Sequence, residues 1–441
     1  MITKHFLSPE PRSQLFRIIV LTAILTKSFL AAITPSSFDF INIVYGTLFV
    51  SNGAWFQGPY TFSVIFMNLF YRLWLLIPID HNWIYSDHVF IPSASGFLLL
   101  FMFKLPLLVL DILTSLLIYK CVSLLTTSKR LATFAMLVWL LNPYLTVAIE
   151  MDGTIDIIST FLIVWATYLF ICNRHAVSGV VLAVATMARF YPIFLIPFFA
   201  FFVLKERRIR NFCLMITAYF ASLAAAVIPF VATYGTDFLN TLYQLPAGGN
   251  KEFIWFFGFR PSVASTSGTE ISSVMTVSTV LGLLVWRVWK TDRRLILDVI
   301  LIVLITYVGL SHFNRYYTIW VVPFLTMDLA MNWDKAYGNV CKALYTLFFL
   351  SAFVYNFAYW WAGTLAIYEF TPQVTEVGAF MREIGSMLRT GDLGTTFSQS
   401  VLAGTCIIYA TMVAMRRIVR NRNQRGNVNC NPCEALMVVK S

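Results

Sequence analysis

The chain has 441 residues, of which 59% are hydrophobic and 12% are charged, and its formal net charge is +11. Soluble domains carry about 25% charged residues, so this composition excludes an ordinary soluble enzyme and predicts an all-α integral membrane protein. In such a protein the basic residues mark the cytoplasmic side, and the positive charge does not indicate a nucleic-acid partner.

About ten apolar segments are predicted to cross the bilayer. The first, 15–33, is long enough to span and no small-residue cleavage motif follows it, so we expect it to stay attached. With the amino terminus in the cytoplasm, the predicted spans lie near 15–33, 97–124, 131–148, 155–172, 212–232, 271–289, 295–311, 317–332, 343–362 and 398–415.

One further apolar stretch, 177–204, is bounded by basic residues at both ends and contains Arg189, Pro192 and Pro197. Proline frees backbone groups, which at membrane depth is tolerated only where protein or water satisfies them. We therefore predict a re-entrant pair of half-helices here, entering and leaving on the cytoplasmic side. Ten full crossings then leave both termini in the cytoplasm.

The distribution of basic residues supports this multi-pass topology. Of the 32 Lys and Arg residues it leaves 23 on the cytoplasmic side and three within membrane segments, Lys27, Lys104 and Arg189. The six outside are Arg72, Lys251, Arg260, Arg315, Arg382 and Arg389. A bias of this size is hard to obtain with the orientation reversed.

The predicted membrane domain covers 1–415, and the basic tail 416–441 is expected to be cytoplasmic and disordered. In the long first external loop, the apolar segment from Tyr60 to Ile79 contains Arg72 and is predicted to lie as a helix in the outer interface. Because the elaborated loops are external, we expect the protein to act on the outer face. These loops are 34–96, 233–270 and 363–397.

Acidic residues at membrane depth are strong functional signals, because each is costly to bury unless it is paired or hydrated. Glu150, Asp152 and Asp156 cluster at the outer end of the fourth predicted span. Carboxylates so close repel unless a cation or a hydroxyl-rich ligand lies between them. The structural alternative is a solvated helix start, where the helix dipole favours acidic residues.

Lys104 and Asp111 are seven residues apart and share a helical face, so they either form a pair that stabilises the bundle or belong to a site. Arg189, beside the predicted break in Met187–Pro192, is a candidate phosphate ligand because the guanidinium fork matches phosphate oxygens. Its alternative role is packing against Asp111.

The predicted external turn from His312 to Tyr317 contains Arg315 at the outer interface, where a lipid phosphate would lie. Snorkelling of the arginine to lipid headgroups would explain its position equally well. Asp39 follows the first span by about six residues between apolar neighbours. Partial desolvation would raise the pKa of this carboxylate and make it a better base, whereas the alternative is a helix N-cap.

Three fragments of the sequence resemble one family. They are Leu141-Asn-Pro-Tyr144, Asp152-Gly-Thr-Ile-Asp156 and the segment from Ala188 to Pro197. Their succession is similar to that of the GPI mannosyltransferase I catalytic subunit and of prokaryotic polyprenyl-phosphate mannosyltransferases, in the GT-C superfamily. The later segment from Tyr316 to Phe324 resembles the closing motif of those families, so the resemblance covers roughly residues 35–325.

The resemblance implies transfer of a hexose, with mannose expected, from a polyprenyl- or dolichyl-phosphate donor to a lipid or glycan acceptor on the extracytoplasmic face. Asp39 matches the position of the family's general base in an inverting single displacement. No cofactor is required by the sequence; if Mg²⁺ or Mn²⁺ takes part, Glu150 and Asp152 are the expected ligands. The expected substrate-binding residues are Lys104, Asp156, Arg189, Tyr191, His312, Arg315 and Tyr316.

This chain departs from the family pattern at several positions. The family commonly has Lys at Arg189 and Gln at Arg315, and the segment Asp39-Phe-Ile-Asn42 offers only one carboxylate where the GPI branch usually has two. Two alternatives therefore stay open: a non-catalytic subunit of a lipid-glycan complex, and a transporter, suggested by the broken helix and the midplane charges. The absence of Asn-x-Ser/Thr sequons from the external loops favours a prokaryotic cell membrane over the endoplasmic reticulum.

Overall fold

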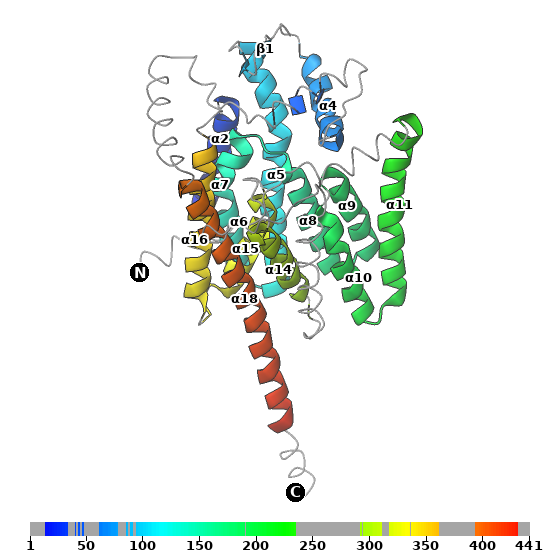
Figure 1. The fold of residues 1–441 in the computed structure, drawn as a ribbon, viewed down its shortest axis with the longest axis vertical. Helices are drawn as coiled ribbons and strands as arrows, with labels where there is room; N and C mark the ends of the chain where they lie inside the picture. Colours follow the sequence, from blue (N-terminus) through cyan, green and yellow to red (C-terminus); the bar gives the residue numbers. More distant parts are fainter. Residues whose placement is uncertain are drawn as a thin grey trace, which may run out of the picture.

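A computed structural model defines the architecture of the protein (Figure 1). The residues that it describes are 14–33, 40, 43–44, 46–47, 61–77, 85–86, 89–90, 94–189, 191–234, 292, 294–310, 317–335, 337–360 and 393–430.

The described residues are almost entirely helical, as the composition predicts. The exception is a short antiparallel hairpin of β1 (Tyr85–Ser86) and β2 (Val89–Phe90). The helices are α2 (Gln14–Ile33), α4 (Thr61–Leu75), α5 (Ala94–Thr126), α6 (Lys129–Leu140), α7 (Pro143–Leu145), α8 (Asp156–Ile171), α9 (His175–Ala188), α10 (Ile196–Lys205), α11 (Ile209–Tyr234), α14 (Leu295–Leu310), α15 (Thr318–Asn332), α16 (Gly338–Trp360) and α18 (Leu393–Cys430), with a π-helical turn η1 (Thr146–Met151) and a 3-10 helix η2 (Tyr191–Leu195).

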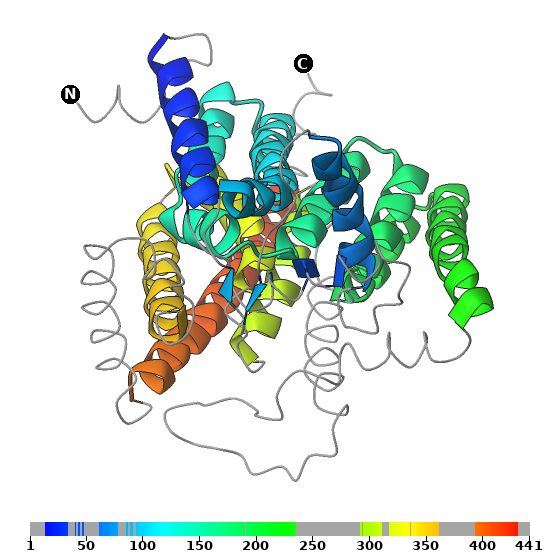
Figure 2. The same ribbon diagram turned by 90° about the horizontal axis from the view of Figure 1, so that it is seen from above.

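Three described helical segments are long and apolar enough to cross a membrane: Gln14–Ala32, Phe101–Thr126 and Ile209–Pro229. The first and third lie at opposite edges of the bundle (Figures 1 and 2), and only 17% and 11% of their residues are buried. An apolar helix that leaves most of its surface uncovered is suited to lipid rather than water. The predicted span 271–289 lies outside the described residues.

The predicted span 131–148 is not one continuous helix. It breaks after Leu140, and the two halves are bent by 40°. The cause is local: the Asn142 side chain accepts hydrogen bonds from the backbone N–H groups of Tyr144 (3.0 Å) and Leu145 (3.4 Å), and Pro143 occupies the first helical position. Asparagine at the N-cap followed by proline is a strong start signal for a new helix.

Helices α8 and α9 lie antiparallel along most of their lengths. Ser159 on α8 donates to the carbonyl of Ala185 at 3.4 Å, and Ser178 on α9 donates to the carbonyl of Ala166 at 2.9 Å. After α9 the chain turns through η2 and returns along α10. Arg208 then donates to the Asn173 side chain at 2.9 Å, so the segment 174–207 begins and ends at the same side of the bundle.

The predicted break in 177–204 is therefore confirmed, as is its return to the side from which it started. That the two helices are re-entrant half-helices stays a prediction. Helix α9 has 14 residues and α8 has 16, which correspond to lengths of about 21 and 24 Å. Helix α9 thus extends along most of α8, and the two serine hydrogen bonds join the pair near both ends. On another face of α9, Gly179 packs closely against α11, since a Cβ atom there would lie 2.4 Å from the carbonyl oxygen of Met215.

The carboxyl-terminal helices pack together and against the helices that precede them. They are α14, α15, α16 and α18. Helix α18 extends beyond the other helices towards the carboxyl terminus (Figure 1), and it continues to Cys430. The expectation that the tail is disordered from residue 416 is therefore wrong for 416–430. Arginine, a good helix former, supplies five of the ten residues 416–425, and 416–431 contain no proline.

The segment predicted to lie as a helix in the outer interface contains helix α4. Asn68 on α4 donates to the carbonyl of Thr47 at 3.1 Å and accepts from Arg72 at 2.9 Å. The first bond attaches α4 to Thr47. The second gives a partner to Arg72, the charged residue because of which this segment is predicted not to cross the membrane.

Candidate functional site

Asp156, the first residue of α8, is the centre of a buried polar group at one end of the bundle. Its carboxylate is fully buried and lies 2.6 Å from Nε of Arg189, whose Nη2 donates to the second oxygen at 3.1 Å. The indole Nε1 of Trp320 donates to Asp156 at 3.1 Å, and the Thr154 hydroxyl lies at 3.2 Å. A two-point arginine–carboxylate contact with further donors fixes both groups in orientation.

Aromatic rings stack on Trp320, the residue whose indole donates to Asp156. Tyr191 stacks on Trp320 with ring centroids 3.7 Å apart and an interplanar angle of 12°. Tyr317 stacks on the same indole at 4.2 Å, and Tyr307 extends the stack at 5.9 Å. The stack holds the Trp320 indole in the plane from which its N–H reaches Asp156.

The two members of the ion pair differ in exposure. The Asp156 side chain is 0% exposed, whereas the Arg189 side chain is 17% exposed. Arg189 is therefore the more accessible member of the pair, although its Nε atom is buried. Such an arrangement presents a positioned positive charge, which is suited to an anionic group such as a phosphate.

The site brings together all the fragments on which the family resemblance depends. Asp156 comes from the second fragment, Arg189 and Tyr191 come from the third, and Trp320 comes from the closing segment. The first fragment joins them because the Tyr144 hydroxyl is hydrogen-bonded to Thr318. Segments up to 174 residues apart in the sequence thus meet at one end of the bundle.

A second buried charge cluster lies beside this site. Lys27 of α2 contacts Asp111 of α5 at 2.9 Å and Glu150 of η1 at 3.1 Å, and all three side chains are at most 2% exposed. Lys104 donates to the carbonyl of Met151 at 2.8 Å. The expected pair of Lys104 with Asp111 is therefore replaced by Lys27 with Asp111.

Asp111 also accepts a hydrogen bond at 2.8 Å from the indole of Trp139. Packing of Arg189 against Asp111, the structural alternative drawn from the sequence, is not what the structure has, since Arg189 pairs with Asp156. The reason is the position of the two residues in the bundle. The hairpin of α9 and α10 places Arg189 beside the start of α8, whereas Asp111 faces α2 and α6.

Glu150 and Asp152 were the expected metal ligands. Within the described part of the chain, no group of three or more His, Cys, Asp and Glu side chains could hold a metal ion. Both Glu150 oxygens accept from the Lys27 ammonium, at 3.2 and 3.1 Å, and the charges of Glu150 and Asp152 both act on Lys104. The carboxylates thus face ammonium groups, and this geometry does not fit a divalent cation.

Four predicted site residues, Asp39, His312, Arg315 and Tyr316, lie outside the described residues. The residue that follows Asp39, Phe40, is described and fully buried.

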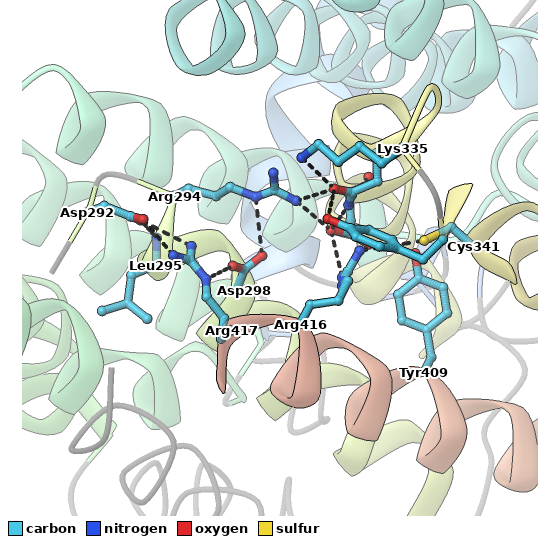
Figure 3. Close-up of polar contacts among 12 residues, drawn as sticks. Asp292, Arg294, Leu295, Asp298, Lys335, Cys341, Tyr409, Arg416 and Arg417 are labelled. Carbon is cyan, nitrogen blue, oxygen red and sulfur yellow. Dashed lines mark hydrogen bonds and ion pairs between the residues drawn. The ribbon is translucent and has the colours of Figure 1, made fainter. Parts of the chain in front are cut away.

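Sequence reasoning missed a third polar cluster, at the opposite end of the bundle (Figure 3). Asp328 of α15 accepts hydrogen bonds from Arg416 at 2.9 and 3.0 Å, from Tyr409 at 2.9 Å and from Asn332 at 2.7 Å. Arg294 approaches the same carboxylate at 3.3 Å. These contacts join α15 to α14 and α18.

Arg417 extends this network. It contacts Asp292 at 2.6 Å and pairs with Asp298 of α14 (Figure 3). The signal that would have revealed the network is the presence of Asp298 and Asp328 inside two predicted spans. Its arginines did not stand out, because basic residues are common at cytoplasmic ends of spans.

No family model matches this chain, and no curated protein matches its sequence.

Proposed function

We propose that this protein is a membrane glycosyltransferase that moves a hexose, with mannose as the first candidate, from a polyprenyl-phosphate donor to a hydroxyl acceptor. The observation that carries the proposal is the meeting of the family-like fragments at Asp156, which binds both Arg189 and the stacked Trp320. An unrelated set of helices would have no reason to bring these fragments together.

Arg189 binds the donor phosphate in this proposal. Asp156 holds the guanidinium by two contacts, and the Arg189 side chain stays 17% exposed, so that a phosphate oxygen can approach it. As the bond between the anomeric carbon and the phosphate oxygen breaks, the leaving polyprenyl phosphate takes the electron pair, and a fixed cation stabilises that charge. Tyr191 and Trp320 supply aromatic surface beside the cation.

Asp39 is the proposed general base. The acceptor oxygen attacks the anomeric carbon from the side opposite to the leaving group and transfers its proton to Asp39, which inverts the configuration. A lipid monophosphate is a competent leaving group, so the proposal has no step through a metal ion. Arg315, His312 and Tyr316 remain proposed donor contacts.

The proposed topology follows from the charge distribution together with the hairpin. The Asp156 end faces the extracytoplasmic side, and the network around Asp328 faces the cytoplasm. Because α9 extends along most of α8, we count the hairpin as two crossings, which raises the proposed number from ten to twelve. Both termini stay in the cytoplasm, since the added number is even.

Purified protein in lipid vesicles, given polyprenyl phosphate carrying labelled mannose, tests this proposal. We expect transfer by the unaltered protein and a loss of donor kcat/KM of roughly ten- to a hundredfold in Arg189→Gln, the effect of losing charge-assisted hydrogen bonds to a phosphate. Arg208→Gln is the matched control, because Arg208 lies at the other end of the hairpin. Failure to transfer any of several hexoses to a panel of lipid and glycan acceptors would contradict the proposal.

The buried cluster of Lys27, Asp111 and Glu150 favours a second candidate, a transporter of a charged or lipid-linked substrate. Ionisable residues inside a membrane domain often mark proton or ion pathways. In that case, vesicles containing the protein should show substrate uptake driven by an ion gradient, and Lys27→Met should abolish the uptake. Sugar transfer without such uptake favours the enzyme.

A further inference from the structure

The turn between η1 and α8 has an unusual backbone conformation at Gly153. Its φ angle is +75°, in the left-handed region that residues with a side chain adopt only at a cost. The N–H of Gly153 bonds to the carbonyl of Ile149 at 3.1 Å, and the next N–H bonds to the carbonyl of Ala148 at 3.1 Å. The turn closes η1 and lets α8 begin at Asp156.

The ring of Phe40 lies directly on this glycine. A Cβ atom at Gly153 would lie 2.7 Å from Cδ2 and 2.8 Å from Cγ of Phe40, far closer than real Cβ atoms approach other carbons. The Phe40 ring also makes an edge-to-face contact with Phe103 of α5, with centroids 6.5 Å apart. Phe40 is 0% exposed, so the ring is fixed between α5 and the Gly153 turn.

We propose that the contact of the Phe40 ring with Gly153 is a positioning contact that holds Phe40 against the turn that precedes Asp156. Phe40 directly follows Asp39, and consecutive Cα atoms are about 3.8 Å apart, so an anchored Phe40 limits the reach of the carboxylate. The proposal rests on the proposed function, in which Asp39 receives the proton of the acceptor. Phe40 and Gly153 touch no substrate and act through Asp39 and Asp156.

Phe40→Leu tests the contact without adding bulk. We expect kcat to fall by roughly ten- to a hundredfold, the effect of a base displaced by about an ångström, while the KM for the donor changes less than about twofold. A smaller folded fraction would also lower the apparent kcat at an unchanged KM, so kcat is expressed per folded molecule, and folding is followed by thermal unfolding. An unchanged kcat in folded Phe40→Leu would overturn the proposal.

Gly153→Ala disturbs the same contact, because the added Cβ atom would displace the Phe40 ring. We expect it to lower kcat at least as much as Phe40→Leu does. The double variant with Phe40→Leu should be no slower than the slower single variant, because both changes remove one contact; independent effects would multiply. Gly404→Ala is the matched control, since a Cβ there meets nothing within 4 Å, and it should retain full activity. A double variant slowed by the product of the two single effects would contradict the shared role.

The outcomes distinguish this proposal from the proposed function. If the unaltered protein transfers no sugar, the proposed function fails. If it transfers sugar, and Asp39→Asn abolishes transfer while folded Phe40→Leu retains its full kcat, only the positioning role fails. Should Gly153→Ala not fold, the Phe40→Leu measurement alone decides.

Discussion

Asp156→Asn and Asp328→Asn are a matched pair of substitutions at opposite ends of the bundle. Both carboxylates are at most 2% exposed, and each receives an arginine and an aromatic donor: Arg189 and Trp320 in the first case, Arg416 and Tyr409 in the second. Asparagine keeps the shape and removes the charge. The pair therefore separates the consequence of breaking a buried ion pair from the consequence of losing the proposed site.

Removal of one partner of a buried ion pair costs about 3–5 kcal/mol, because the other charge stays buried without compensation. The Arg189 side chain is 17% exposed, so its charge is partly solvated when Asp156 is lost. We therefore expect Asp156→Asn to lower the free energy of unfolding by about 3 kcal/mol, the lower end of this range. Asp328 interacts with two arginines, of which Arg416 is 11% exposed and Arg294 is 17% exposed. For Asp328→Asn we expect about 3–5 kcal/mol.

The assay combines thermal unfolding in detergent with sugar transfer per folded molecule. Both variants should be destabilised to a similar extent. Only Asp156→Asn should also lose donor kcat/KM, by roughly ten- to a hundredfold, because Arg189 is no longer held for the phosphate. If the two variants lose stability alike and also keep equal activity per folded molecule, Asp156 is a structural residue and the reasoning is refuted.

Three further outcomes follow from the same contacts. Trp320→Phe keeps the stack but loses the indole bond to Asp156, so donor kcat/KM should fall by about tenfold or more in steady-state kinetics, whereas a value within twofold would show that the bond is dispensable. Lys27→Met should lower the free energy of unfolding by about 3–5 kcal/mol, and adding Glu150→Gln should recover part of the loss in thermal unfolding; no recovery would contradict the charge balance. Arg416→Lys keeps the charge but loses the fork geometry, so stability should fall by about 1 kcal/mol with transfer per folded molecule unchanged.

The helical class and most helix positions were predictable because hydropathy is a local property of the sequence. The break near Pro192 was predictable for the same reason, since proline acts within one turn of its position. The resemblance pointed to Arg189 and Tyr191, which the structure brings together with Asp156. The break at Asn142 could also have been predicted, because asparagine followed by proline is a helix-start signal. It was missed because the surrounding residues form one continuous apolar run.

The charge partners were not predictable, because pairing depends on which helices become neighbours. The spacing of Lys104 and Asp111 shows that they share a helical face. It does not reveal that Lys27 of α2 is the residue that pairs with Asp111. Asp328 likewise appears isolated in the sequence, and its two arginine partners, Arg294 and Arg416, lie 34 and 88 residues away. The helical continuation of α18 was missed because charge was weighed above helix propensity.

The most direct test of the central claim compares transfer of labelled mannose from polyprenyl phosphate by the purified protein and by Asp39→Asn. Loss of transfer in a folded Asp39→Asn protein that still binds the donor is the result that we predict, since the substitution removes the proton acceptor and leaves the Arg189 site in place. Undiminished transfer by Asp39→Asn would remove that residue as the base. No transfer by either protein would contradict the glycosyltransferase account.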